Sequence, residues 1–309
     1  MSSVGAGLWR TDDLHHWRRE PAVPDTARLF ALAADDDVLV AGGDGCVYRR
    51  DGQRWTTLPL PSADLQPWSL AVSASTVLAG CRPLALLRSD DAGEHWRALE
   101  LTLPPGTPQP HTARVTAILV EADAIWCGVE VGGVFRGDRD GTHWRAVNDG
   151  LPSLDIHALA RAGDALVAAT PRGIARYDGA WSAAALHAPW RYCRALAATE
   201  ERHGGAVALP SAGGLGGPSR PPCGSILCGL GDGPPGSRGG VVISEDGGRS
   251  WHGALFPGTA ASTVWSIAVA DGQALAASIG GELFSSEDDG RTWTRIPQTF
   301  QEVRAVLFH

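Results

Sequence analysis

One column of residues in this sequence suits ligand binding better than packing. When short apolar segments that recur along the chain are aligned, that column holds Phe30, Trp68, Thr116, His157, Arg194, Trp265 and Arg304. Arg can hold a carboxylate, phosphate or sulfate through two parallel N–H groups, and Trp adds a stacking surface. The column therefore predicts a site for a polar or anionic ligand. The predicted ligand-binding residues are Arg194, Arg304, His157, Trp68 and Trp265, with Arg82 and Arg172 from neighbouring turns.

Catalytic candidates are few. His157 with Asp155 is a possible base and partner, and Glu130 with Glu282 would suit a glycosidase if their carboxylates lay about 5–10 Å apart. The sequence contains no serine nucleophile elbow, Walker loop or dinucleotide fingerprint. The question of enzymatic activity stays open but leans toward a non-catalytic protein, and no cofactor is implied.

Cysteines offer a possible metal site. Cys223 and Cys228 form a C-x₄-C pair, and Cys81, Cys127 and Cys193 fall at strand ends. Thiolates bind zinc and other soft metals, whereas buried free cysteines more often act as small apolar residues. We predict no metal site.

The elements that would position these residues are marked by a repeated turn, S-x-D-x-G-x-x-W. Three copies are complete: Ser89, Asp91, Gly93, Trp96; Ser244, Asp246, Gly248, Trp251; and Ser286, Asp288, Gly290, Trp293. Gly allows a positive φ, Asp and Ser bond the turn backbone, and Trp needs a buried slot with a partner for its N–H. Each copy follows one apolar run and precedes another, which predicts a hairpin.

The turn tryptophans set a repeat. They are Trp17, Trp55, Trp96, Trp144, Trp181, Trp251 and Trp293. Most units contain four short apolar runs separated by Gly, Pro and Asp, and successive tryptophans are 37–48 residues apart except across one 70-residue step. This pattern predicts an all-β fold: a seven-bladed β-propeller of four-stranded antiparallel blades. Residues 303–308 are expected to close the ring as the innermost strand of the N-terminal blade.

The domain organisation follows from the repeat. We expect residues 1–309 to form a single propeller, because stacked repeats share one continuous core. The 70-residue step must hold an insertion, and the Gly/Pro-rich segment 200–238 is expected to be a long loop within the sixth blade.

The turn and its spacing resemble those of the Asp-box (BNR repeat) propellers. That group includes sialidases, sortilin-type receptors, photosystem II assembly factors and many uncharacterised bacterial proteins. The resemblance implies that the turns are structural and lie on the face opposite the ligand. Sialidases carry an Arg-Ile-Pro motif early in the chain, but here Arg295-Ile296-Pro297 follows the last turn and the N-terminal unit has none. The resemblance therefore predicts the fold and gives little support to sialidase activity.

Composition limits the partners. The net charge of −8 and the pI near 5.6 argue against binding to nucleic acid or an anionic membrane. The first residues resemble no signal peptide and no apolar run is long enough for a membrane helix, so we expect a cytoplasmic protein with reduced cysteines.

Three functions stay open. The first is a recognition scaffold that binds a small polar or anionic ligand, or a segment of a partner protein, at the mouth of the central channel. The second is a glycosidase-like hydrolase or a lyase acting on a sugar or related acid. The third is an assembly factor for a larger complex.

Overall fold

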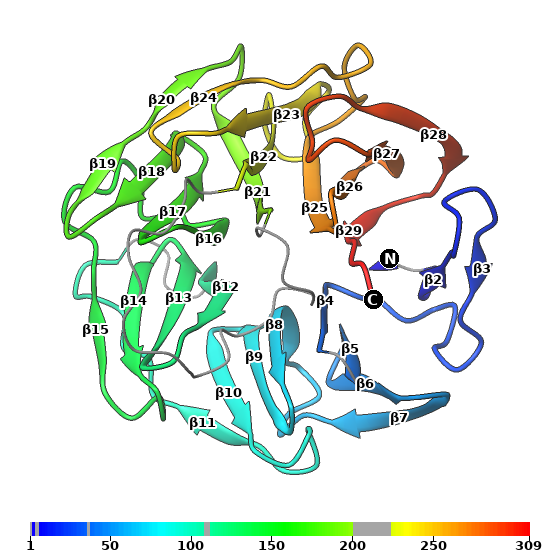
Figure 1. Cartoon of the computed structure of the whole chain (residues 1–309). Helices are drawn as coiled ribbons and strands as arrows, with labels where there is room; N and C mark the ends of the chain where they lie inside the picture. Colours follow the sequence, from blue (N-terminus) through cyan, green and yellow to red (C-terminus); the bar gives the residue numbers. More distant parts are fainter. Residues whose placement is uncertain (1, 4–5, 36–37, 108–111, 200–223) are drawn as a thin grey trace, which may run out of the picture.

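The structure is a computed structural model that describes residues 2–3, 6–35, 38–107, 112–199 and 224–309. In these ranges the chain forms β-sheets that stand around a central axis, each with one edge strand at the centre and the other at the rim (Figure 1). No helix in the described ranges is long and apolar enough to cross a membrane.

Each large sheet is ordered from the centre outward. The strands at the centre are β4 (Ala31–Ala34), β8 (Gln66–Ser73), β12 (Arg114–Val120), β16 (Ala158–Ala162), β21 (Tyr192–Ala198) and β25 (Val264–Ala270). The second strands are β5 (Val38–Gly43), β9 (Thr76–Arg82), β13 (Ala124–Glu130), β17 (Ala165–Thr170), β22 (Ile226–Gly231) and β26 (Gln273–Ser278).

The outer half of each large sheet completes the blade. The third strands are β6 (Cys46–Asp51), β10 (Ala85–Ser89), β14 (Gly133–Asp138), β18 (Gly173–Tyr177), β23 (Gly239–Ser244) and β27 (Glu282–Ser286). The rim strands are β7 (Arg54–Pro59), β11 (Arg97–Leu99), β15 (Trp144–Ala146), β19 (Trp181–Ala183), β24 (Ser250–Gly253) and β28 (Thr294–Thr299). One further strand, β20 (Ala185–His187), pairs in parallel with β24.

The prediction of seven four-stranded blades is wrong. The described residues form six large sheets, five with four strands and one with five. In place of a seventh blade there are two separate two-stranded sheets: β1 (Ser2–Ser3) with β29 (Val303–Ala305), and β2 (Trp9–Arg10) with β3 (Arg18–Arg19). Gly7, with φ of 70°, lies between β1 and β2, in a conformation that does not continue a strand ladder.

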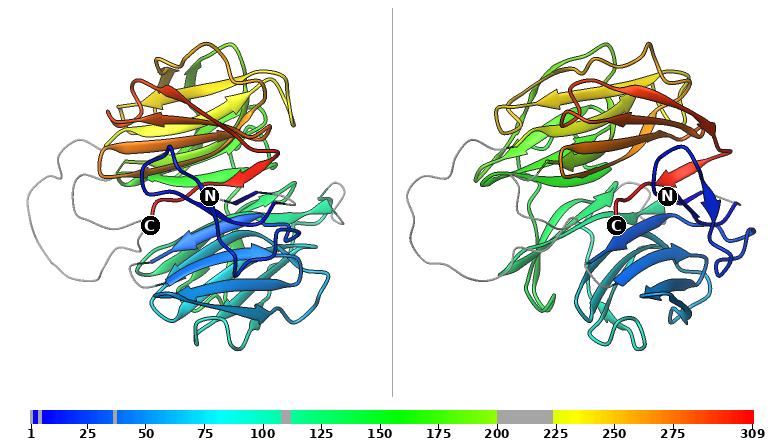
Figure 2. Two further views of the ribbon diagram at one scale, coloured as in Figure 1. Left: turned by 90° about the vertical axis from the view of Figure 1, so that its right-hand side faces the viewer. Right: turned by 45° about the vertical axis from the view of Figure 1, so that its right-hand side comes forward.

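The two ends of the chain meet at this position. β29 pairs antiparallel with β1 and also contacts β25 on one side and β4 on the other. The N- and C-terminal segments lie together between the last large sheet and the first (Figures 1 and 2). The chain therefore forms a ring in which this pairing joins the beginning and the end.

The predicted insertion, residues 200–238, lies partly outside the described residues, which resume at 224. Of the remainder, β22 is the second strand of its sheet, and 232–238 form the connection from β22 to β23. The division into one domain over 1–309 with a single insertion stays a prediction.

Neighbouring sheets pack through apolar faces. One cluster joins Ile174 of β18 to Ile226 of β22 and to Trp251, all buried. Sheets that cover one another in this way hide both faces, so most second strands carry consecutive buried residues, as in Ala165–Thr170. The ring is therefore a rigid support for residues at its centre.

The S-x-D-x-G-x-x-W turns connect third strands to rim strands. In the copy at 244–251, the Ser244 hydroxyl donates to Asp246 Oδ1 (2.9 Å) and accepts from the Gly248 amide (2.9 Å). The Trp251 indole N–H donates to the Gly248 carbonyl at 3.1 Å. The copy at 89–96 makes the same Ser and Asp bonds, but the buried Trp96 indole nitrogen has no hydrogen-bond partner.

These turns lie far from the starts of the central strands. The Ala92 amide donates to the Ser75 carbonyl in the β8–β9 turn (2.6 Å), and the Asp289 amide donates to Gly272 in the β25–β26 turn (2.9 Å). These two turns are therefore at the end of their sheets where the central strand finishes.

Candidate functional site

The aligned column of seven residues lies at the beginning of the central strands, at a repeated β-bulge. In β8, Pro67 pairs with Cys81 and Ser69 with Gly80, so Trp68 between them has no partner of its own. In four other strands the pairing passes over one residue in the same way, and these residues are Thr116, Arg194, Trp265 and Arg304. Phe30 and His157 are bulged too. The Phe30 amide donates to the Gly42 carbonyl, although Gly42 is the partner of Ala31. The His157 amide donates to the Ala169 carbonyl, although Ala169 is the partner of Ala158. A bulge re-aims a side chain, and here it turns one residue per strand toward the axis.

Small residues opposite the bulges bring the sheets close together. A Cβ on Gly128 would lie 2.6 Å from Ile156 Cγ2, and one on Gly80 would lie 2.5 Å from Val115 Cγ1. Ile156 and Val115 directly precede His157 and Thr116 in the next sheet. Glycine on the second strand therefore lets the next central strand approach, and this approach positions its bulged residue.

All seven residues line one cavity along the axis. This channel cavity has a volume of about 280 Å³. The structure thus places the whole column on one common space. Their role in binding a ligand stays a prediction.

Arginines and aromatic rings alternate around the mouth of this channel. The Arg194 guanidinium carbon lies 4.1 Å from the Trp265 ring centroid, and that of Arg304 lies 5.3 Å from Trp265 and 5.2 Å from Trp68. Arg114 stacks on Trp68 at 3.9 Å, and Phe30 stacks on Trp68 with centroids 5.3 Å apart. Stacking holds the planar guanidinium groups while their edges stay available for hydrogen bonds.

Arg194 differs from its neighbours in charge balance. Arg114 forms a two-point ion pair with Glu130, and Arg304 pairs with Glu302 at 2.5 Å. In the part of the chain that the structure describes, no carboxylate lies within ion-pair distance of Arg194. Its Nη1 donates to the His157 carbonyl (3.1 Å), whereas its Nε is buried without a partner. Burial lowers the pKa of Arg194 to about 10, so the side chain is charged at neutral pH.

His157 is held in place rather than free to act as a base. Its Nδ1 lies 2.6 Å from the Cys193 carbonyl and its Nε2 lies 3.5 Å from Asp155 Oδ1. Its ring also contacts that of Tyr192, with centroids 4.8 Å apart. The residue is only 5% exposed, so the main contribution of His157 is the carbonyl that receives Arg194.

The other predicted site residues lie away from the channel cavity. Arg82, the last residue of β9, and Arg172, in the turn between β17 and β18, are both exposed. Glu130 is bound to Arg114, and Glu282 is bound to Arg295 while it accepts from the Ala261 amide (2.6 Å). Neither Glu130 nor Glu282 is among the described residues that line the channel cavity or the hollow beside it.

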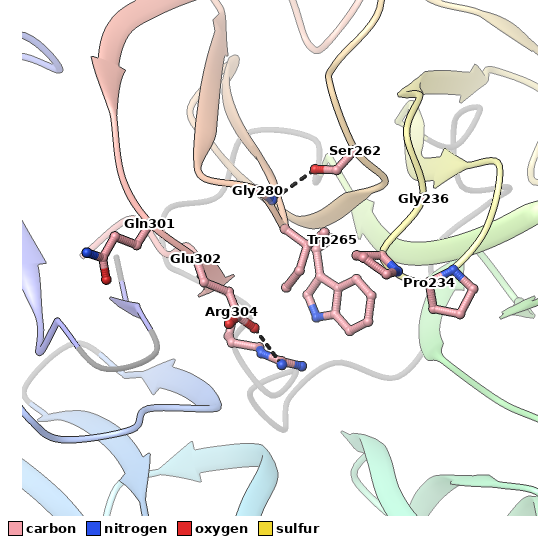
Figure 3. A pocket seen from close by; sticks show the side chains of 10 residues that line it. Pro234, Gly236, Ser262, Trp265, Gly280, Gln301, Glu302 and Arg304 are labelled. Atoms are coloured by element: carbon pink, nitrogen blue, oxygen red, sulfur yellow. Dashed lines mark hydrogen bonds and ion pairs between the residues drawn. The ribbon is translucent and has the colours of Figure 1, made fainter.

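That hollow lies at the mouth of the channel. It has a volume of about 520 Å³, and the residues around it include Pro234, Ser262 and Glu302. Trp265 and Arg304 line both spaces. Figure 3 shows the Trp265 indole and the Arg304 guanidinium beside each other, with Glu302 bonded to Arg304. A ligand in the hollow would reach the channel between these two side chains.

The cysteines do not gather into a metal site in the described ranges, where no three His, Cys, Asp or Glu residues come together. Cys81, Cys127, Cys193 and Cys228 are buried and free. Burial raises the pKa of the Cys81 thiol to about 12, which disfavours the thiolate that metals need. Cys223 lies outside the described residues.

Two contributors to the site were not predicted as binding residues. Arg114 stacks on Trp68, and Glu302 pairs with Arg304. The sequence places Arg114 at the mouth, because it leads into a first strand, but outside the aligned column. Glu302 lies two residues before the bulged Arg304, the same position that Arg114 holds before Thr116.

Comparison with known proteins identifies the fold. No protein-family model and no curated protein sequence matches the chain. The solved structure of YCF48 bound to D1 peptide is 17% identical with a TM-score of 0.57, covering 90% of this chain and 87% of that one. YCF48 from Cyanidioschyzon merolae is 16% identical (TM-score 0.62; 89% and 87% covered), and a chain of the mitotic checkpoint complex is 13% identical (0.63; 99% and 86%). This chain has a β-propeller fold.

Proposed function

We propose that the protein is a non-catalytic recognition scaffold that binds an anionic group at the mouth of its channel. The group is carried by a small ligand or by a segment of a partner protein. The observation that carries this proposal is Arg194, a buried guanidinium that lacks a carboxylate partner in the described ranges and stacks on Trp265.

The energetics of Arg194 support a ligand. A buried N–H without a partner costs about 1–3 kcal/mol, and hydrogen bonds that involve a charged group are stronger than neutral ones. A carboxylate at the part of the guanidinium that lines the channel cavity would form charge-assisted hydrogen bonds and neutralise the charge. The stacked, fixed guanidinium needs little reorganisation to receive it.

Binding of a protein segment is consistent with the comparisons at the level of fold. In the structure of YCF48 bound to D1 peptide, a propeller holds a peptide. A segment with a carboxylate would meet the same arginines here. The assembly-factor alternative is one form of this second case.

The glycosidase alternative has less support. Glu130 and Glu282 are each engaged by an arginine of their own sheet, and His157 bonds a backbone carbonyl. A glycosidase pair needs one carboxyl group free to donate a proton beside a second that attacks or activates water. The arrangement favours binding over this chemistry.

We also propose that the repeats are Asp-box (BNR) repeats of the uncharacterised bacterial branch, supported by the Ser–Asp–Gly hydrogen bonds shared by the three complete turns. A cytoplasmic location is proposed as well. It is supported by the five free cysteines of the described ranges, since oxidising compartments favour disulfides.

The proposal is tested by thermal shift with small anions (acetate, citrate, phosphate and sulfate) and with peptides that end in a carboxylate or an amide. We expect at least one anion or carboxylate peptide to raise the melting temperature. The Arg194→Ala variant should lose this response and Arg54→Ala, on the rim strand β7, should keep it. An identical response in the Arg194→Ala variant would contradict the proposal.

A further inference from the structure

A second ring of residues lies below the aromatic and cationic mouth. It occupies the position two residues after each bulge, and every member is aliphatic. The ring consists of Leu32, Leu70, Ile118, Leu159, Leu196 and Ile267, with Val306 from the segment after β29. All of them line the channel cavity, and those on the strands from β4 to β21 are only half-buried. Apolar side chains at the centre of the fold thus face the channel cavity.

The size of the channel cavity matches a short hydrocarbon. An apolar cavity of about 150 Å³ accommodates benzene, with its six carbon atoms. The channel cavity, at about 280 Å³, is nearly twice as large. It therefore has room for an alkyl chain of about eight to ten carbons.

The polar end of the site is suited to a single negative charge. Arg114 and Arg304 form ion pairs with Glu130 and Glu302, whereas no carboxylate in the described ranges lies within ion-pair distance of Arg194. A monoanion would give Arg194 the ion pair that Arg114 and Arg304 already have, whereas a phosphate dianion would bring a second negative charge close to Glu302 and Glu130. A sugar would need donors and acceptors along its length, and the aliphatic ring has none.

The spacing of the two ends agrees with such a ligand. Arg194 and Leu196 lie two residues apart on β21, which is about 7 Å along a strand. A carboxylate on the Arg194 guanidinium would place the first carbons beside Trp265 and the later ones against the ring. A four-carbon acid would end before reaching it.

We propose that the channel binds a medium-chain monocarboxylate, with its carboxylate on Arg194 and its alkyl chain against the aliphatic ring. This inference rests on the proposed function, because both need Arg194 to hold an anion. The inference adds that the ligand carries an alkyl chain, which defines its class as a medium-chain monocarboxylate.

Calorimetric titration with octanoate, butyrate and 1-octanol tests the inference on the unaltered protein. We expect octanoate to bind about 10- to 100-fold more tightly than butyrate, because four more methylene groups are buried. We expect 1-octanol to bind at least about 10-fold more weakly than octanoate, since it cannot balance the charge of Arg194.

Variants separate the two ends of the site. Leu196→Gln should weaken octanoate about 10-fold and leave butyrate unchanged, whereas Leu255→Gln, at an exposed leucine outside the channel, should change neither. Arg194→Ala should weaken both acids about 10-fold or more, and Arg54→Ala neither. Circular dichroism confirms folding, and if Leu196→Gln does not fold, Leu70→Gln replaces it.

The outcomes distinguish this inference from the proposed function. Equal affinity for octanoate and butyrate would contradict the proposed binding of an alkyl chain, but it would not contradict anion recognition by Arg194. Octanol binding as tightly as octanoate, or octanoate unaffected by Arg194→Ala, would overturn both. A preference for octanoate that needs Arg194 and Leu196 supports both.

Discussion

At the scale of single residues, the site depends on small side chains as much as on charged ones. The glycines opposite the bulges have no functional group, but they determine how closely the next sheet approaches. Gly128 lies opposite Ala117 in β12 and against Ile156 of the next sheet. The orientation of His157, and through its carbonyl that of Arg194, depends on this contact.

Gly128→Ala is therefore expected to destabilise the protein by about 1–3 kcal/mol, because its Cβ would overlap Ile156 in a packed interior. The measurement is the free energy of unfolding in urea. Gly253→Ala is the matched control: it is also a strand glycine, but its added Cβ would meet nothing within 4 Å. We expect the control to be neutral or stabilising by up to about 1 kcal/mol. Equal loss in both variants would show that the close approach is unimportant.

At the scale of elements, the repeated turn is held by a serine that is fully buried. The Ser244 hydroxyl is the partner of both Asp246 and the Gly248 amide. Ser244→Ala leaves that amide unsatisfied, so we expect a loss of about 1–3 kcal/mol in urea unfolding. Ser182→Ala, at an exposed position on β19, is expected to change little. If the Ser182→Ala variant lost as much stability, the hydrogen bonds of Ser244 could not be the cause.

The same turn predicts that the stability of the protein decreases at acidic pH. Burial alone would raise the pKa of Asp246, but hydrogen bonds from the Ser250 hydroxyl and amide and from the Ser244 hydroxyl lower it from 3.8 to about 2. The pKa of Asp246 is lower in the folded protein than in the unfolded chain. The stability that the ionised Asp246 contributes is therefore complete above about pH 4 and is lost as the pH falls from about 4 through 2.

We therefore expect stability to fall between pH 6 and pH 3, and to fall less in Asp246→Asn, whose amide does not titrate. The free energy of unfolding in urea at the two pH values provides the comparison. Asp164→Asn, at an exposed aspartate outside the complete turns, should show the same fall as the unaltered protein. A fall as large in Asp246→Asn would refute the assignment.

At the scale of the whole molecule, the sequence predicted the propeller but counted one blade too many. Each turn tryptophan reports a local hairpin, and Trp17 does precede a strand, β3. A hairpin signature does not report how many residues enter the ladder, and β3 pairs with β2 over only two positions. The channel column was predictable because the bulge falls at one register position in every repeat. The ion pairs of Arg304 and Arg114 were not, because they depend on side-chain directions that the sequence does not give.

The joining of the two chain ends should make the ring sensitive to Val303, a fully buried residue of β29. Val303→Asp places a charge in that contact, which folding tolerates poorly without a partner. Because β29 contacts β25 and β4, we expect faster hydrogen exchange in the sheets on both sides of it, β4–β7 and β25–β28. Val129→Asp, equally buried in β13, should accelerate exchange in its own and adjacent sheets instead. If both variants gave the same exchange pattern, the end-to-end pairing would contribute no more than any other core contact, and the ring would be held by its sheets alone.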